Sequence, residues 1–484
     1  SITENLDPYT SFLVEDQQYS IELLTDGKYG GVGIQLGYRN KEMTVISPMS
    51  GSPAQKAGIT SGDIIKKIDD SEVKDMTFND AAAKIRGKKG TKVKLTVKRF
   101  GESENIDFIL TRSSIDVKDI SYSGLISPTT GYIKLNRFSR FASRDFQKEL
   151  VSLSKNDIGQ LIIDLRDNTG GLLSAAVNIL DMVTDKDLPL VSTKGRTKES
   201  NRSFYSKRNP IISNDVRIVV LINQGSASAS EIVAGAIQDL DRGIVIGEKS
   251  FGKGLVQTAY EIDKKRTIKI TTARYFIPSG RFIQKRDYID SKFLMNKADE
   301  DSLFKTMNGR TVYGNGGITP DSIVIDKKME MISTQFWRNG YFYSFAQENK
   351  FLYDSFSDVQ KDKELFNKFN KYLDKRKKAA LPGQKELNDL EKNIMSIDST
   401  DTNARKALNT LSDFFYKNLD EQTNNESEQM YKLLLLEFAG LFNGPEGRIE
   451  QSFENDSVLK TALNIIENKN LFTTTISNNQ ITNN

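Results

Sequence analysis

Two residues of this 484-residue chain are placed for chemistry, and the first is a serine that follows a predicted strand. The apolar run 218–222 predicts a buried strand, and the small residues 225–230 lead from it into a helix. Ser228 stands in that turn, where free N–H groups and the positive end of the helix dipole would stabilise an oxyanion. Ser228 and Glu231 also form a capping box, which begins many helices that have no activity. On this stretch alone, the cap is the simpler interpretation.

The second residue is Lys253, in the glycine-rich turn 247–254 that follows another predicted strand. If the chain runs strand–helix–strand, the second strand returns beside the first and brings Lys253 to the same sheet edge as Ser228. A free lysine has a pKa of about 10.4, so it becomes a base at neutral pH only where burial lowers that pKa. Gln257 follows at a spacing that lets it hydrogen-bond the neutral amine. An isolated Gly-Lys-Gly is otherwise typical of a surface turn.

The same turn also resembles a phosphate-binding loop, because Gly247, Gly252 and Lys253 have its spacing. Gly254, however, stands where Mg²⁺ ligation needs Ser or Thr. Residues 255–260 predict a strand, whereas a phosphate-binding loop leads into a helix. A nucleotide-dependent enzyme is therefore a less favoured interpretation.

A third predicted strand, 161–165, ends in a polar turn that contains Gly170 and Gly171. Glycines allow backbone N–H groups to converge on an anion. A tight strand–helix turn explains the same residues without any function.

Composition narrows the chemistry further, because the chain has no Cys and no His. Thiolate nucleophiles and Ser–His–Asp triads are excluded, so a proton carrier near neutral pH must be Lys, Glu, Asp or Tyr with a shifted pKa. The net charge of +4 (68 basic against 64 acidic residues) gives no support to nucleic-acid binding. No apolar run reaches membrane-spanning length, and no signal peptide opens the sequence.

The residue pattern changes three times along the chain, and the length itself predicts two to four domains. We expect an opening segment 1–28 with a helix at 17–24, a strand-rich part 30–112, an α/β part 116–326, helices over 330–470 and a frayed end 478–484.

Taken together, the three turns resemble the motifs of the carboxyl-terminal processing proteases, also called tail-specific proteases. The similar runs are Asp164-Leu165-Arg166-x-Asn168-x-Gly170-Gly171, Ser226-Ala227-Ser228-Ala229-Ser230-Glu231-Ile232 and Phe251-Gly252-Lys253-Gly254-x-Val256-Gln257. Further similar runs are Leu6-Asp7-Pro8-Tyr9, Gly131-Tyr132-Ile133, Tyr275-x-x-Pro278-Ser279-Gly280-Arg281 and Gly316-Gly317-Ile318-x-Pro320-Asp321. The resemblance covers roughly residues 1–325 and leaves the role of the helical remainder open.

The resemblance implies a catalytic role for each residue of the site. Ser228 is the nucleophile, Lys253 the general base, and Gln257 positions the lysine. The N–H of Ala229 and that of Gly170 or Gly171 form the oxyanion hole. No metal and no cofactor is implied. The implied fold class is a multidomain α/β protein, with an α/β Ser–Lys protease core of crotonase-like ββα architecture, an inserted β-rich PDZ domain and a helical C-terminal region.

Residues 30–112 resemble the PDZ domain of that family. Its carboxylate-binding loop corresponds to Gly31-Val32-Gly33-Ile34, and capture of a terminal carboxylate together with strand addition would accept many substrate tails. Arg86, next to Gly87, is a candidate for coupling tail binding to the catalytic groups.

We therefore predict an exported, for example periplasmic, bacterial serine endopeptidase that recognises the C-terminal tails of its substrates. Its partners are proteins or peptides with free, apolar C-termini, and the helical region is a candidate for adaptor binding or self-association. The predicted domains are an N-terminal part of the core (1–28), a PDZ domain (29–113), the protease core (114–328), a helical domain (329–475) and a flexible tail (476–484). The alternative from another class is a non-catalytic, tail-binding scaffold on the same fold.

Overall fold

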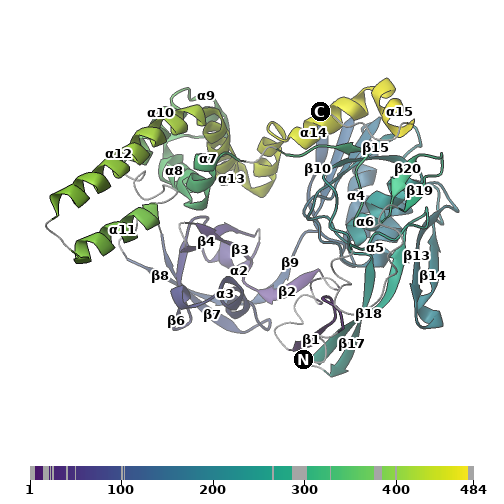
Figure 1. The fold of residues 1–484 in the computed structure, drawn as a ribbon. Helices are drawn as coiled ribbons and strands as arrows, with labels where there is room; N and C mark the ends of the chain where they lie inside the picture. The colour runs from purple at the N-terminus through teal and green to yellow at the C-terminus, as the bar shows by residue number, and fades with distance from the viewer. Residues whose placement is uncertain are drawn as a thin grey trace. The chain divides into compact units, whose positions relative to one another are not determined.

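The computed structural model describes most of the chain and divides it into two units, each described by itself below (Figure 1). The described residues are 6–14, 21, 23, 25, 27–39, 42–49, 51–99, 102, 104–263, 266–285, 302–314, 316–326, 329–374, 384–397 and 401–477. The first unit contains residues 1–29, 116–326 and 456–484, and the second contains 30–115 and 327–455. The predicted helix at 17–24 falls mostly, and the predicted frayed end 478–484 wholly, outside the described residues.

A six-stranded sheet forms the centre of the first unit, with the strand order β10-β11-β12-β15-β16-β21. The strands are β10 (Ile120–Ser127), β11 (Thr130–Leu135), β12 (Gln160–Asp164), β15 (Arg217–Ile222), β16 (Gly243–Gly247) and β21 (Ser322–Ile323). All neighbours are parallel except β10 and β11. The strands predicted at 161–165, at 218–222 and before the turn 247–254 are confirmed, and their continuous apolar character reflects burial on both faces of the sheet.

Helices cover the two faces of this sheet. They are α4 (Ala142–Ser154), α5 (Leu173–Leu180), α6 (Ala229–Asp239), α14 (Ser457–Glu467) and α15 (Lys469–Ser477). Alternate strand residues such as Ile163 and Val220 pack in one apolar core with α4, α5 and α6. The helix α14 contacts β12, β15 and β16. These helices do not cover the carboxyl ends of the parallel strands. Ligand sites in such sheets form at those ends.

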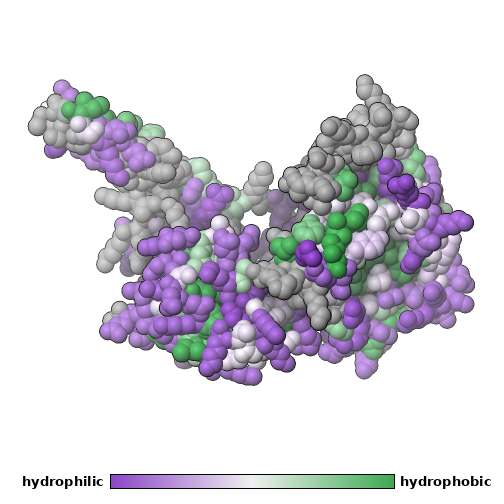
Figure 2. All heavy atoms as spheres, turned by 90° about the horizontal axis from the view of Figure 1, so that it is seen from below, coloured by the Kyte–Doolittle hydropathy of each residue, from purple (hydrophilic) through white to green (hydrophobic). Residues whose placement is uncertain are grey.

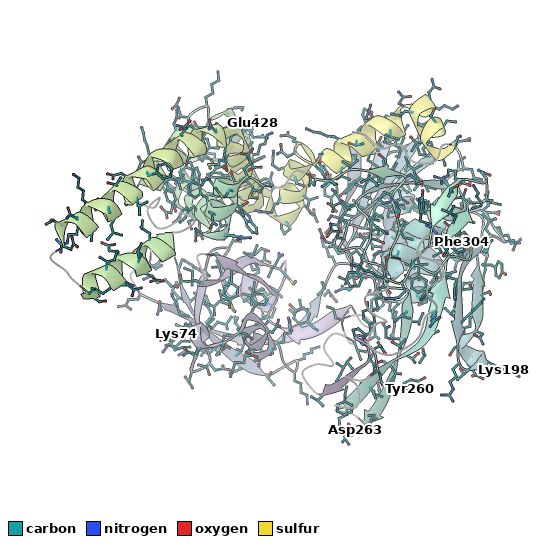
Figure 3. The ribbon with its side chains drawn as sticks, viewed as in Figure 1. Lys74, Lys198, Tyr260, Asp263, Phe304 and Glu428 are labelled. Carbon is teal, nitrogen blue, oxygen red and sulfur yellow. The ribbon has the colours of Figure 1, made fainter. Side chains whose placement is uncertain are left out.

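A second sheet of the same unit contains a long hairpin. Its strands are β1 (Ser11–Val14), β13 (Pro189–Gly195), β14 (Arg202–Tyr205), β17 (Leu255–Asp263) and β18 (Arg266–Phe276). The strands β17 and β18 form the hairpin, and Tyr260 and Asp263 lie toward its far end in Figure 3. The short strands β19 (Leu303–Lys305) and β20 (Thr311–Tyr313) pair with each other. The hairpin thus starts directly after Lys253.

The second unit contains the predicted PDZ domain. Its sheet has the order β3-β4-β5-β7-β8, formed by β3 (Ile34–Arg39), β4 (Glu42–Pro48), β5 (Ile64–Ile68), β7 (Lys92–Lys98) and β8 (Ile106–Thr111), and β6 (Ser71–Glu72) pairs with β5. Two helices, α2 (Pro53–Lys56) and α3 (Phe78–Ile85), complete it, and β2 (Lys28–Gly31) pairs with β9 (Ser113–Asp116). Ser52 caps α2, because its Oγ accepts a hydrogen bond of 3.2 Å from the N–H of Gln55.

The remainder of the second unit is helical, as predicted. Its helices are α7 (Met331–Arg338), α8 (Tyr341–Asn349), α9 (Phe356–Lys361), α10 (Leu365–Asp374), α11 (Gln384–Ile397), α12 (Thr402–Asn425) and α13 (Ser427–Phe453). Aromatic side chains form much of its core, with the rings of Phe342 and Phe369 stacked at 4.9 Å between centroids.

The boundary predicted at residue 475 for the helical domain differs from the structure. The helices α14 and α15 belong to the α/β unit instead. Asp456 caps α14 by accepting a 2.8 Å hydrogen bond from Leu459 N–H, and it also pairs with Arg166 at 2.6 Å. An amphipathic pattern predicts a helix but does not name the surface that the helix covers, so the sequence suggested one helical domain.

Hydrophilic side chains cover most of the face seen in Figure 2, with apolar side chains in small patches. Among the described helices, none combines the length and the hydropathy needed to cross a membrane.

Candidate active site

The turn between β15 and α6 holds Ser228 in an unusual backbone conformation. Its φ of 56° and ψ of −112° lie outside the regions that L-residues commonly occupy. Such an outlier persists only where its surroundings impose it, and these outliers cluster at functional sites. Here the turn is tied to the loop after β12, because Ala227 N–H and Ser230 Oγ donate to Asn168 O at 3.0 and 2.8 Å. Ser228 itself is half-buried at the carboxyl end of the sheet.

Gly170 lies so close to the turn of Ser228 that no residue with a side chain fits in its place. A Cβ on Gly170 would lie 2.9 Å from both Ser228 Cβ and Ala229 N, and the φ of Gly170 is +97°. The predicted oxyanion residues are therefore brought together with Ser228. The N–H of Gly170 already donates to Asn168 Oδ1 at 2.9 Å. This bond favours Gly171 over Gly170 as the glycine that supplies a free donor.

Lys253 follows β16 and precedes β17, and it is half-buried. Its pKa is lowered to about 8, mainly by burial and also by the charge of Lys269, whereas Glu231 and Asp7 act in the opposite direction. The ring of Tyr9 lies 4.7 Å from the Lys253 Nζ, measured to the ring centroid. A strand follows the lysine, as predicted, so the turn is not the start of a phosphate-binding helix.

Two side chains connect the turns of Ser228 and Lys253. The buried carboxylate of Glu231 accepts hydrogen bonds from the N–H groups of both residues, at 2.7 and 2.9 Å. The hydroxyl of Tyr275 donates to Lys253 O at 2.7 Å and lies 3.2 Å from Ser228 O. The two predicted catalytic residues therefore meet at one sheet edge, as the strand–helix–strand interpretation required.

The part that these two connecting residues play does not follow from the sequence. On sequence alone, Glu231 is half of a capping box and Tyr275 is part of a similar run. A signal for Glu231 was present, because it lies in the same motif as Ser228. No local pattern connected Tyr275 to either turn.

Gln257 lies at the start of β17, but its hydrogen bond differs from the predicted one. Its Nε2 donates to Thr271 Oγ1 at 3.4 Å, and Thr271 Oγ1 donates to Asp7 Oδ1 at 3.0 Å. The prediction that Gln257 positions the lysine amine stays a prediction.

The predicted carboxylate-binding loop, Gly31 to Ile34, is buried at the start of β3. The carbonyl of Val32 accepts from Ala54 N–H at 3.0 Å, and that of Gly33 accepts from Met49 N–H at 2.9 Å. In a trans peptide the C=O and N–H point in opposite directions, so the N–H groups of Gly33 and Ile34 face away from these donors. The strand β3 is an edge strand of its sheet, and the role of this loop in carboxylate binding stays a prediction.

Arg86 directly follows α3 in the second unit and is half-buried. Its proposed coupling to the catalytic groups stays a prediction.

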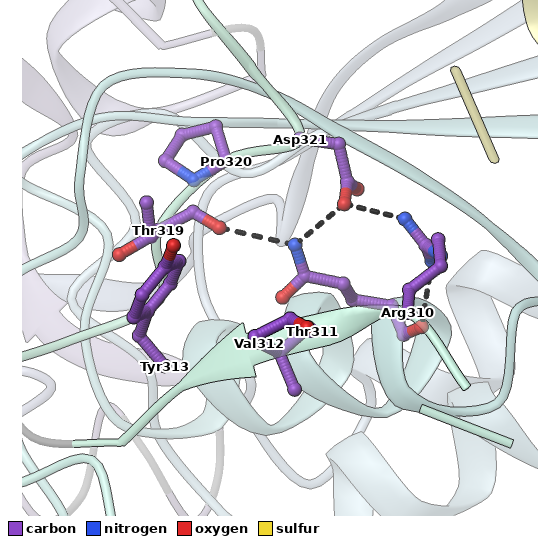
Figure 4. A pocket seen from close by; sticks show the side chains of 8 residues that line it. Arg310, Thr311, Val312, Tyr313, Thr319, Pro320 and Asp321 are labelled. Atoms are coloured by element: carbon purple, nitrogen blue, oxygen red, sulfur yellow. Dashed lines mark hydrogen bonds and ion pairs between the residues drawn. The ribbon is translucent and has the colours of Figure 1, made fainter. Parts of the chain in front are cut away.

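A separate set of buried charges lies in the first unit, and we call it the arginine cluster: Arg281, Arg310, Asp239, Asp241 and Asp321. Figure 4 shows Arg310 and Asp321 of this set. The cavity beside it measures about 10 Å³, room for no more than one water molecule. Its ion pairs and small volume indicate a structural role. Over the part of the chain that the structure describes, no group of three or more acidic side chains is arranged to hold a metal ion.

Comparison with known proteins identifies the class of protein that this fold and site define. Residues 129–290 match peptidase family S41, residues 30–110 match a PDZ domain, and residues 330–466 match the probable PDZ-protease C-terminal helical domain. The chain therefore belongs with the carboxy-terminal processing proteases of peptidase family S41.

Individual relatives carry the same description. The carboxy-terminal-processing protease of Bartonella bacilliformis is 38% identical over 284 residues, which cover 58% of this chain and 64% of that protein. The carboxy-terminal processing protease CtpA of Bacillus subtilis is 37% identical over 58% of this chain and 59% of its own length. The chain thus spans less than two thirds of the length of these two relatives.

Among solved structures, the photosystem II D1 C-terminal processing protease is 31% identical. The match covers 57% of this chain and 75% of that protein, with a TM-score of 0.36.

Proposed function

We propose that this chain is a serine endopeptidase that uses Ser228 as nucleophile and Lys253 as general base. The observation that carries the proposal is the meeting of these two residues, where Ser228 has a strained backbone and Lys253 is partly buried without an anionic partner. Within the described ranges, no ion pair joins Lys253 to a carboxylate. A lysine with a pKa of about 8 is neutral in a useful fraction near neutral pH.

The reaction is acyl transfer. The neutral amine of Lys253 takes the proton of Ser228 Oγ as that oxygen bonds to the carbonyl carbon of the scissile peptide. The resulting oxyanion accepts hydrogen bonds from Ala229 N–H and from the N–H of Gly171 or Gly170. The C–N bond then breaks, and Lys253 returns the proton to the leaving amine. A water molecule, deprotonated by Lys253, hydrolyses the acyl-enzyme and frees Ser228.

Substrate selection is proposed to lie in the PDZ domain. A terminal carboxylate would accept from the N–H groups of Gly33 and Ile34, and the substrate tail would add as a strand beside β3. This mode uses backbone hydrogen bonds, so it accepts many sequences with apolar ends. Export of the protein, and an adaptor-binding or self-association role of residues 330–466, are proposed from the family resemblance.

The test is the mass of products from an unstructured polypeptide with an apolar C-terminus, incubated with wild type and with Ser228→Ala. The proposal predicts cleavage by wild type only, and weaker cleavage when the same substrate carries an amidated C-terminus. Binding of the tail without cleavage would favour the non-catalytic scaffold. Equal cleavage by both proteins would show that Ser228 is not the nucleophile.

A further inference from the structure

Glu231 makes more contacts than a helix cap requires. Its side chain is fully buried, and each carboxylate oxygen accepts two hydrogen bonds. Oε2 accepts from the N–H of Ser228 and of Lys253, at 2.7 and 2.9 Å. Oε1 accepts from Ser250 Oγ at 2.5 Å and from Gly252 N–H at 2.7 Å. Three of these four donors belong to the turn that carries Lys253, and the fourth belongs to the nucleophile.

The chain offers an ordinary capping box for comparison. Asp80 of α3 accepts from the N–H and the hydroxyl of Thr77, at 3.2 and 2.6 Å, and it remains on the surface. A cap therefore needs only a local bond to the preceding turn. Burial of a carboxylate is costly, and capping does not require it. The burial of Glu231 is explained by its bonds to the Lys253 turn, which is distant in sequence.

All four partners of Glu231 are donors, which indicates the charge of the group. Ser250 Oγ accepts from Ile318 N–H at 2.6 Å, so its own proton points to Glu231. Burial raises the pKa of Glu231, but the hydrogen bonds to its carboxylate oppose that rise. With two donors directed at each oxygen, neither oxygen has a free direction for a proton. Glu231 is an anion in this arrangement.

Tyr275 connects the same two turns through their carbonyl groups. It is buried on β18, and its hydroxyl lies 2.7 Å from Lys253 O and 3.2 Å from Ser228 O. The N–H groups of Ser228 and Lys253 thus share one acceptor, and their carbonyls share one donor. Displacement of either turn breaks bonds on both sides.

We propose that Glu231 and Tyr275 are positioning residues that lock the turns of Ser228 and Lys253 together. The inference rests on the proposed peptidase function. Neither side chain needs to touch the substrate. Each acts by holding Ser228 and Lys253 in the relative position that proton transfer requires, because a displacement of about 1 Å costs roughly 10²-fold in rate.

The charge of Glu231 also acts on the amine of Lys253, with a definite sign. The charged groups that act on this amine are Glu231 on α6, Asp7 of the opening segment and Lys269 on β18, and the ring of Tyr9 lies beside it. Glu231 and Asp7 raise the pKa of Lys253, and burial and Lys269 lower it. Removal of the Glu231 charge must therefore lower the pKa of Lys253 further.

Three variants separate positioning from general damage. Glu231→Gln keeps the shape, removes the charge and turns an NH₂ group toward two donors. We expect kcat to fall about 10²-fold while KM changes less than about twofold. In the pH profile of kcat/KM, the acid limb should move to lower pH. Tyr275→Phe removes only the hydroxyl, so kcat should fall about tenfold with the acid limb unmoved. Asp321→Asn, a buried carboxylate of the arginine cluster, is the matched control and should leave the acid limb in place.

A second readout does not depend on peptidase activity. The pH dependence of Lys253 acetylation by acetic anhydride, followed by peptide mass spectrometry, reports the pKa of its amine. Glu231→Gln should lower the midpoint relative to wild type, and thermal unfolding should show that the variant is folded. If Glu231→Gln does not fold, the kcat of Tyr275→Phe decides the positioning claim.

Wild-type kcat and an unmoved acid limb in Glu231→Gln would overturn the inference, and so would an equal shift of the acid limb in Asp321→Asn. A wild-type protein that cleaves no substrate would refute the proposed function, and the acetylation midpoint would still test the link between Glu231 and Lys253.

Discussion

The arginine cluster and the proposed catalytic pair are both buried in the α/β unit, but their charges meet different partners. In the cluster, Arg281 pairs with Asp239 at 2.8 Å. Arg310 pairs with Asp241 at 2.6 Å and with Asp321 at 2.5 Å. Figure 4 shows the second of these pairs. Every one of these carboxylates has an arginine, whose charge does not titrate in a protein.

At the proposed catalytic pair the buried carboxylate meets neutral donors, and the amine lies beside a ring with no ion pair to a carboxylate among the described residues. Glu231 takes three backbone N–H groups and one hydroxyl. Lys253 faces Tyr9, and its pKa falls to about 8 because burial is not offset by a paired anion. The difference shows that an ion pair keeps a buried group charged, whereas burial without an ion pair leaves the group able to exchange its proton.

Replacement of Lys253 by arginine should give the largest effect. Lys253→Arg keeps a cation in place but removes the group that loses a proton, because arginine remains charged. We expect kcat to fall by at least about 10³-fold, measured by cleavage of an unstructured polypeptide. Lys249→Arg makes the same exchange at an exposed position of the same turn and should keep wild-type activity. Activity of Lys253→Arg within tenfold of wild type would exclude the lysine as base.

Breaking the arginine cluster should affect stability and leave the proton chemistry unchanged. Arg310→Met leaves Asp241 and Asp321 buried without their cation, so the free energy of unfolding should fall by about 3–5 kcal/mol. Urea unfolding measures this loss. Arg202→Met, at an exposed position, should cost less than about 0.5 kcal/mol. A shifted acid limb in Arg310→Met would mean that the two clusters are not separate.

The smallest effect is expected at a paired charge near the surface. Asp456→Asn keeps the N-cap of α14 but weakens the contact with Arg166, so the free energy of unfolding should fall by about 1 kcal/mol. Thermal or urea unfolding measures it, with Ser457→Ala as the neighbouring control. A loss as large as that of Arg310→Met would show that the pairing at Arg166 is as important as the buried cluster.

The meeting of Ser228 and Lys253 was predictable from sequence, because it depends on parallel strands that end at one edge. The apolar runs of β15 and β16 were clear, and right-handed strand–helix–strand connections leave one arrangement for the turns that follow them. The class of protein followed from three motifs in one order.

Contacts made by residues distant in sequence were not predictable in the same way. Tyr275 reaches the site from a second sheet, and the partner of Gln257 depends on the register of β17 against β18, which has a shift between Val256 and Gln257. The arginine cluster was missed because a charged residue gives no local sign of burial. The packing of α14 on the α/β sheet was missed because its apolar face fits many surfaces.

The pH dependence of Ser228 acylation tests the central claim most directly. The wild-type protein is treated with a fluorophosphonate between about pH 6 and 11, and intact and peptide masses give the rate and the modified residue. The account predicts modification at Ser228, with a rate that rises as Lys253 loses its proton, through a midpoint near pH 8. Modification elsewhere, a rate independent of pH, or a midpoint near the ordinary lysine value of about 10.4 would contradict it.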